Sequence, residues 1–188
     1  MAAEQTTAAP FRRLSRTRDI RFSLRIKARP DRVYRALTSA TELCRWWLEG
    51  AETDARNVGR FRMVWPKVRC RDGHRHFPPH AAVGETEGYF VDLEPGRKVA
   101  WMWKLPRMRK RIPPLASFFI VPKPGGCEVT LLHAGFSAAP EGDKHYAGSV
   151  QGWEDALAKL KLYLETGRTL KTQSIDFKAL RALRARGR

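Results

Sequence analysis

The segment GSVQGWEDALAKLKLYLETG, residues Gly148 to Gly167, decides the fold. Its apolar side chains recur at the spacing of one face of an amphipathic helix, which makes a long helix the prediction here. They are Val150, Trp153, Leu157, Leu160 and Leu164, with Ala156 and Tyr163 at the margins. Asp155, four residues before Lys159, indicates the solvent-facing side, and Gly167 suits the position just past the last turn. Such a helix needs a large apolar partner.

Most of the chain before this helix has the alternating pattern of β-strands. The first strand begins at Arg18, where apolar residues from Ile20 to Ala28 alternate with basic and polar ones. Further strands are predicted over 61–65, 83–93, 99–103, 117–121 and 127–135, with turns at Gly59, 94–97 and 123–126. Because short turns join consecutive strands, the sheet is expected to be antiparallel.

Two short helices are predicted between the first two strands. Pro30 suits the first position of one helix, and Ser39 with Glu42 forms a capping box for the other, which ends at Trp46 and Trp47. The fold predicted is therefore α+β, with a curved antiparallel sheet of about six or seven strands around the long carboxyl-terminal helix. A space between sheet and helix is where a small apolar ligand would bind.

Composition favours one globular domain, because 43% of the 188 residues are hydrophobic. The three cysteines, Cys44, Cys70 and Cys127, are widely spaced and include no CxxC pair, so neither a disulfide framework nor a zinc ribbon is implied. The longest apolar run, Leu115 to Val121, is too short to cross a bilayer, and the first residues lack the apolar segment of a secretory signal. We therefore expect a cytoplasmic protein.

The chain is strongly basic, with 36 Lys and Arg against 19 Asp and Glu and a formal net charge of +17. The basic residues cluster between Arg12 and Arg25, between Lys104 and Arg111, and beyond Lys178. Such clusters suit nucleic acid, an anionic membrane or an acidic protein, and are equally those of a solvated basic surface. The first cluster lies partly in an Arg- and Ser-rich start that would also suit a mitochondrial transit peptide.

Three parts of the chain are expected. Residues 1–17 form a flexible basic arm, residues 18–167 form the domain, and residues 168–188 form a basic tail. In that tail, Ile175, Phe177, Leu180 and Leu183 have the spacing of a short amphipathic helix. The tail could bind a partner, pack on the domain or fray. Any affinity for nucleic acid is expected to be independent of sequence and to fall steeply with salt.

Several segments occur together in a family-like order. They are PDRVYRALTSATELCRWW (30–47), GRFRMVW (59–65), GETEGYFVDLEPGRKVAWMW (84–103), CEVTLLHAGF (127–136) and GWEDALAKLKLYLETG (152–167). In this order the chain, from about Arg18 to Gly167, resembles the Activator of Hsp90 ATPase homologue 1-like family of the START-like, helix-grip (SRPBCC) superfamily. The resemblance implies a container fold for lipids, hormones or polyketides, a few members of which are enzymes. The eukaryotic namesake is a cochaperone with an additional amino-terminal domain, to which nothing in this sequence corresponds.

The candidate ligand-binding residues are mostly aromatic residues expected in the interior. They are Trp46, Trp47, Trp65, Glu85, Trp101, Trp103, His133, Phe136, Trp153 and Leu157. The aromatics would form a flat apolar pocket with indole N–H groups for orientation, or simply the core, since such rings dominate core burial. Glu85 and Glu87 share one face of a strand and would act as acid or base only if that face is the cavity. His133 would be a polar pocket group, or a neutral histidine at a sheet surface.

A loop after the second strand contains Cys70, His74, His76 and His80, a thiol and imidazole set that suits zinc. The spacing matches no standard zinc motif, so neither a metal nor another cofactor is predicted.

The preferred function is therefore binding without catalysis: the domain holds an apolar or aromatic small molecule between sheet and helix. A cochaperone-like interaction module acting through the basic surface, on an acidic protein or chaperone, is the alternative. A cyclase- or dehydrase-like enzyme comes third, because no catalytic set is recognisable.

Overall fold

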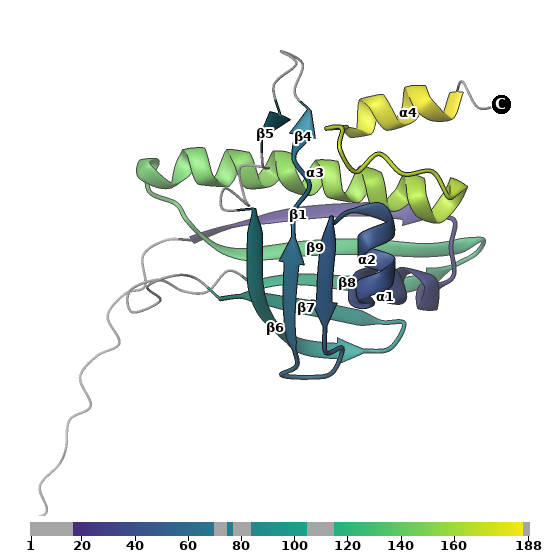
Figure 1. Cartoon of the computed structure of the whole chain (residues 1–188), viewed down its shortest axis with the longest axis horizontal. Coiled ribbons are helices and arrows are strands. Elements are labelled where there is room, and N and C mark those ends of the chain that lie inside the picture. Colours follow the sequence, from purple (N-terminus) through teal and green to yellow (C-terminus); the bar gives the residue numbers. More distant parts are fainter. Residues whose placement is uncertain (1–16, 70–74, 77–83, 105–114, 186–188) are drawn as a thin grey trace, which may run out of the picture.

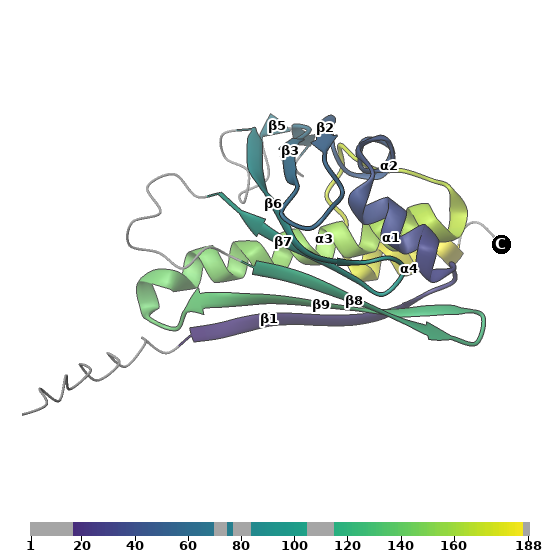
Figure 2. The same cartoon turned by 90° about the horizontal axis from the view of Figure 1, so that it is seen from below.

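The computed structural model describes residues 17–69, 75–76, 84–104 and 115–185, leaving out the side chains of 68, 69, 75, 76 and 184. A seven-stranded antiparallel sheet curves around one long helix, as predicted (Figures 1 and 2). The elements in chain order are β1 (Thr17–Ile26), α1 (Pro30–Thr38), α2 (Ala40–Trp46), β2 (Gly50–Thr53), β3 (Arg60–Val64), β4 (Val68–Arg69), β5 (Arg75–His76), β6 (Glu85–Glu94), β7 (Lys98–Trp103), β8 (Leu115–Lys123), β9 (Gly126–Ser137), the 3₁₀ helix η3 (Pro140–Gly142), α3 (Asp143–Thr166) and α4 (Phe177–Ala185).

The main sheet has the strand order β1-β9-β8-β7-β6-β3-β2, and β4 and β5 form a separate pair. Two irregularities bend its strands. Register shifts occur between Arg18 and Ile20 on β1, opposite Gly135, and between Phe90 and Asp92 on β6. Gly135 has a φ of 93°, a conformation that side chains with a Cβ rarely adopt. Because an extra residue in one strand increases local twist and bending, these bulges help to curve the sheet around α3.

Helix α3 begins at Asp143, five residues before the predicted start, and ends where predicted. Gly167 adopts the left-handed conformation with a φ of 71°, and its N–H donates to the carbonyl of Tyr163 at 2.8 Å. Trp153, Leu157 and Leu160 are buried against the sheet, as their spacing predicted. This face of α3 and the concave face of the sheet enclose the core.

The short helices α1 and α2 cover one end of the curved sheet (Figure 2). Pro30 is the first residue of α1, and the Ser39 hydroxyl accepts a hydrogen bond from the Glu42 N–H at 3.5 Å at the start of α2. The Glu42 carboxylate bonds instead to the Arg45 guanidinium at 2.7 Å and to the Tyr163 hydroxyl at 2.9 Å. These contacts tie the start of α2 to the last turns of α3.

The far face of α3 is covered by the carboxyl-terminal segment, contrary to the prediction that Asp155 and Lys159 mark a solvent-facing side. Lys159 is 3% exposed, and its ammonium group lies 2.6 Å from the Asp155 carboxylate. Ala158 and Leu162 of α3 pack with Ile175 and Leu180 in a small second core. Figure 1 shows α4 on the opposite side of α3 from the sheet. Sequence spacing alone showed the charged pair but not the segment that buries it.

Other calls fall outside what the structure describes. The basic arm before residue 17, Cys70, His74 and His80 lie outside the described residues, and of His76 only the backbone is described, in β5. Within the described ranges no group of His, Cys, Asp or Glu side chains is arranged to hold a metal ion. Across the same ranges no helix has the length and apolar character needed to span a membrane.

Candidate functional site

The concave side of the sheet holds an aromatic cluster, which we define as Trp47, Trp65, Trp101, Trp103, His133, Phe136 and Trp153. It draws on every layer of the fold: Trp47 follows α2, Trp101 and Trp103 come from β7, His133 from β9 and Trp153 from α3. Trp46 stacks on Trp47 at one end of the cluster, and Leu157 is 1% exposed in the same core. The fold thus brings nine of the ten candidate binding residues together.

Trp47 lies at the centre of the cluster because its backbone leaves the helical conformation just after α2, with a φ of −129° and a ψ of −49°. Its ring centroid is 4.9 Å from that of Trp65, 5.8 Å from Trp101 and 6.2 Å from Trp153. Stacked and edge-to-face rings at such separations attract one another beyond their area burial. Among the described residues, then, these rings are in mutual contact. An open cavity between sheet and helix stays a prediction.

The indole N–H groups are satisfied with one exception. Trp46 donates to the Ala36 carbonyl at 2.9 Å, Trp65 to the Thr86 hydroxyl at 3.1 Å, and Trp153 to Nδ1 of His133 at 2.7 Å. Trp101 is 0% exposed, and its Nε1–H has no hydrogen-bond acceptor within the described part of the chain. Leaving a buried donor unmade costs about 1–3 kcal/mol, so this N–H is out of keeping with an ordinary core.

His133 is an interior polar group rather than a histidine at an exposed sheet surface. It is 7% exposed, and its ring contacts Trp103 at 5.3 Å and Phe136 at 4.5 Å between centroids. Accepting the Trp153 N–H at Nδ1 requires the neutral ring with its proton on Nε2. Trp103 beside it is only half-buried. This end of the cluster is the part nearest to solvent.

Glu85 lies on the opposite, convex face of the sheet and is not brought to the aromatic cluster. Its carboxylate accepts from the Arg62 guanidinium at 2.6 Å, and Glu87 lies 3.7 Å from the Lys104 ammonium group. Both side chains are about half exposed, at 50% and 53%. The open question of which way this face points is therefore answered in favour of solvated charges. These carboxylates are not placed to act on a ligand in the interior.

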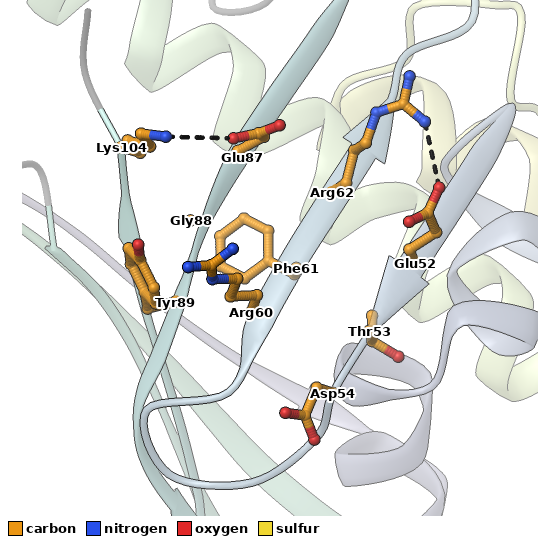
Figure 3. Close-up of a pocket in the computed structure, with 10 residues that line it drawn as sticks. All are labelled: Glu52, Thr53, Asp54, Arg60, Phe61, Arg62, Glu87, Gly88, Tyr89 and Lys104. Atoms are coloured by element: carbon orange, nitrogen blue, oxygen red, sulfur yellow. Dashed lines mark hydrogen bonds and ion pairs between the residues drawn. The ribbon is translucent and has the colours of Figure 1, made fainter.

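The same convex face carries a groove of about 400 Å³, which we call the outer groove. It lies over β2, β3, β6 and the end of β7, and Arg60, Arg62, Tyr89 and Lys104 are among the residues that line it (Figure 3). Hydrogen bonds to Glu85 and then Glu52 raise the pKa of Arg62 above its usual range. Sequence reasoning missed this groove. The only signal for it was the alternation that places Arg60 and Arg62 opposite the buried Phe61 and Met63.

The comparisons with known proteins agree on the family and the fold. The family model described as Activator of Hsp90 ATPase homolog 1-like protein matches residues 27–165 of the chain. A comparison with curated proteins finds no match.

Solved structures with the same fold have low sequence identity to this chain. The protein MLL2253 of Mesorhizobium loti is 20% identical, with a TM-score of 0.62 over 80% of this chain and 99% of that chain. The Aha1 dimer of Colwellia psychrerythraea is 23% identical, with a TM-score of 0.60 over 80% and 98%. DynU16, from the dynemicin biosynthetic locus, is 14% identical, with a TM-score of 0.60 over 80% of this chain and 48% of that chain. At these identities the likeness concerns the fold alone.

Proposed function

The chain belongs to the Activator of Hsp90 ATPase homolog 1-like family, and on that premise we propose that it is a non-catalytic protein that binds an apolar or aromatic small molecule. The molecule binds between the sheet and α3, within the aromatic cluster. The observation that carries this proposal is the buried Nε1–H of Trp101, which has no acceptor in the described part of the chain.

The surroundings of Trp101 indicate what kind of molecule fits. Its ring contacts those of Trp47, Trp103 and Trp153, at centroid distances of 5.8, 6.1 and 6.4 Å. Flat indole faces favour a flat, apolar ligand, and an N–H without an acceptor favours a ligand that carries one, such as a ketone or quinone oxygen. Access is proposed beside Trp103, the half-buried member of the cluster. The ligand would displace rings that now contact one another.

Binding is tested by native mass spectrometry of the purified protein and by quenching of tryptophan fluorescence. Emodin, a flat aromatic polyketide with carbonyl acceptors, and palmitate are suitable probes. Trp101→Phe keeps a ring but removes the N–H, and we expect it to weaken emodin binding about tenfold, the upper end of one hydrogen bond's net contribution. Trp46→Phe is the matched control, because the Trp46 N–H is already used by the Ala36 carbonyl. It should change stability more than affinity.

The outcome that contradicts the proposal is plain. A bare mass, together with unchanged fluorescence and melting temperature across fatty acids, polyketides and aromatic compounds, would show that the cluster is only core. Equal emodin affinity of Trp101→Phe and the unaltered protein would remove the role assigned to the Trp101 N–H.

A cochaperone-like role is the second candidate function, and the exposed cationic side chains Arg21 and Arg25 of β1 and Lys178 and Arg181 of α4 favour it. The Colwellia neighbour, described as an Aha1 dimer, assembles with itself. Replacing Lys178 and Arg181 with Gln separates the two candidates. Capture of an acidic partner should weaken while emodin binding is retained.

We place this function in the reducing cytoplasm. Of the cysteines in the described ranges, Cys44 and Cys127 are both free thiols, and burial raises the pKa of the Cys127 thiol although Lys161 opposes this. Free, buried thiols suit a compartment in which disulfides do not form. The catalytic alternative is not developed, because no described residue pair near the cluster combines a nucleophile with a base.

A further inference from the structure

The outer groove lies on the face of the sheet that the aromatic cluster does not use. On β3 and β6, alternate residues point to opposite sides: Phe61 and Phe90 are 2% and 0% exposed in the core, whereas Arg60 is exposed and Tyr89 half-buried on the other face. Gly88 separates the two environments, because a Cβ there would lie 2.4 Å from the Phe61 ring. Whatever occupies this groove is therefore independent of an interior ligand.

The charges that line the groove are balanced except at one point. Each of its three carboxylates already has a cation: Glu52 has Arg62 at 3.1 Å, Asp54 has Arg56 at 2.8 Å, and Glu87 has Lys104 at 3.7 Å. Arg60 is in no ion pair with any described carboxylate. Figure 3 shows its guanidinium extending over the groove toward Tyr89, its direct cross-strand partner. An anion entering the groove thus meets an uncommitted cation, whereas a cation meets only occupied carboxylates.

We propose that the outer groove is a binding site for a small molecule in which a carboxylate is attached to a flat ring. The guanidinium of Arg60 is a planar fork of donors that fits a carboxylate with two parallel hydrogen bonds. The adjacent Tyr89 ring offers a flat, amphipathic surface on which the ligand ring packs. Lys104 is 60% exposed at the same end and adds positive potential. A volume of about 400 Å³ is at the small end of the range for ligand sites, which suits one ring and its substituents.

Benzoate is the simplest probe, and its binding is measured on the full chain by titration of ¹⁵N amide chemical shifts. We expect the shifts to concentrate at the amides of Arg60, Gly88 and Tyr89. Arg60→Gln should weaken benzoate binding about tenfold or more, the effect of losing one charge-assisted hydrogen-bonded pair. Because Arg60 is exposed, this variant should keep the fold, and its own amide spectrum reports whether it does.

Two controls make the result specific. Arg56→Gln removes an arginine of the same region that is already paired with Asp54, and it should leave benzoate affinity unchanged. Benzamide has the same shape without the charge and should not bind. The proposal is overturned if benzamide binds as well as benzoate, if Arg60→Gln retains full affinity, or if the shifts follow the basic surface in general. None of these measurements depends on an interior ligand, so this site and the proposed function fail separately.

Discussion

Among single residues, Lys159 and Asp155 depart most from what their spacing indicates. As a pair four residues apart on a helix they are ordinary surface neighbours, yet their side chains are 2% and 16% exposed. The second Asp155 oxygen accepts the Ile175 N–H at 2.8 Å, and Lys159 also reaches the Lys171 carbonyl at 3.4 Å. A buried ion pair is tolerated only when its remaining hydrogen-bonding capacity is met, and backbone groups of the carboxyl-terminal segment meet it here.

This burial has a consequence for the dependence of stability on pH. Burial raises the pKa of the Asp155 carboxyl above its ordinary value of 3.8, although Lys159 and the Ile175 N–H oppose the rise. Between those two pKa values the folded chain binds more protons than the unfolded chain, so stability from this group grows as pH falls. We expect acidification from neutral pH toward 3.8 to stabilise the unaltered protein relative to Asp155→Asn. Urea midpoints of both proteins at a series of pH values measure this. A stability gap independent of pH would contradict it.

At the scale of elements, the segment after Gly167 is part of the domain's packing. The Lys171 ammonium group donates to the carbonyls of Cys44 at 2.8 Å and Leu48 at 3.1 Å, at the end of α2, where a cation complements the helix dipole. Glu154 of α3 accepts the Phe177 N–H at 3.2 Å at the start of α4. Deleting this segment would expose Ala158 and Leu162 and open the Lys159–Asp155 pair. Truncation is therefore a poor test of what the tail binds.

Point substitutions on α4 distinguish packing from surface charge. Leu180 is 3% exposed in the second core, and Leu180→Ala should reduce the free energy of unfolding by about 2–5 kcal/mol. Arg181→Ala, one residue along on the exposed side, should change it by no more than about 0.5 kcal/mol. Urea denaturation of both variants compares them. Equal midpoints for the two would mean that α4 is not held on α3 in solution.

Over the whole molecule, the charge of +17 is the dominant long-range property. It sets encounter rates and non-specific affinity rather than the fold. The cationic side chains of β1 and α4 lie on elements that the fold places against opposite sides of α3, and the described residues include no nucleic-acid-binding motif. Any binding to polyanions is therefore expected to be electrostatic.

We expect duplex DNA of two unrelated sequences to bind with equal affinity. The logarithm of the affinity should fall linearly with the logarithm of salt concentration, with a slope of about −0.9 for each phosphate contacted. Fluorescence anisotropy at several salt concentrations measures both quantities. Affinity that survives high salt and prefers one sequence would contradict this expectation.

Much of the architecture was predictable because it rests on local periodicity. The spacing of Trp153, Leu157 and Leu160 indicated the long helix, the alternation of Phe61, Met63 and Trp65 indicated β3, and Ser39 marked the start of α2. Those patterns are confirmed, because a helix or a strand repeats its buried face at a fixed interval in the sequence. Membership of the family followed from the order of these same segments.

The sequence by itself thus determined which elements form, which of their faces are apolar and that the molecule is cationic. Only the tertiary structure decided that the Trp101 N–H lacks an acceptor among the described residues, that the carboxyl-terminal segment buries Lys159, and that Arg60 and Tyr89 meet in the outer groove. The reason is physical. Each of these facts depends on contacts between residues far apart in the chain, and side-chain periodicity along one element carries no information about its neighbours.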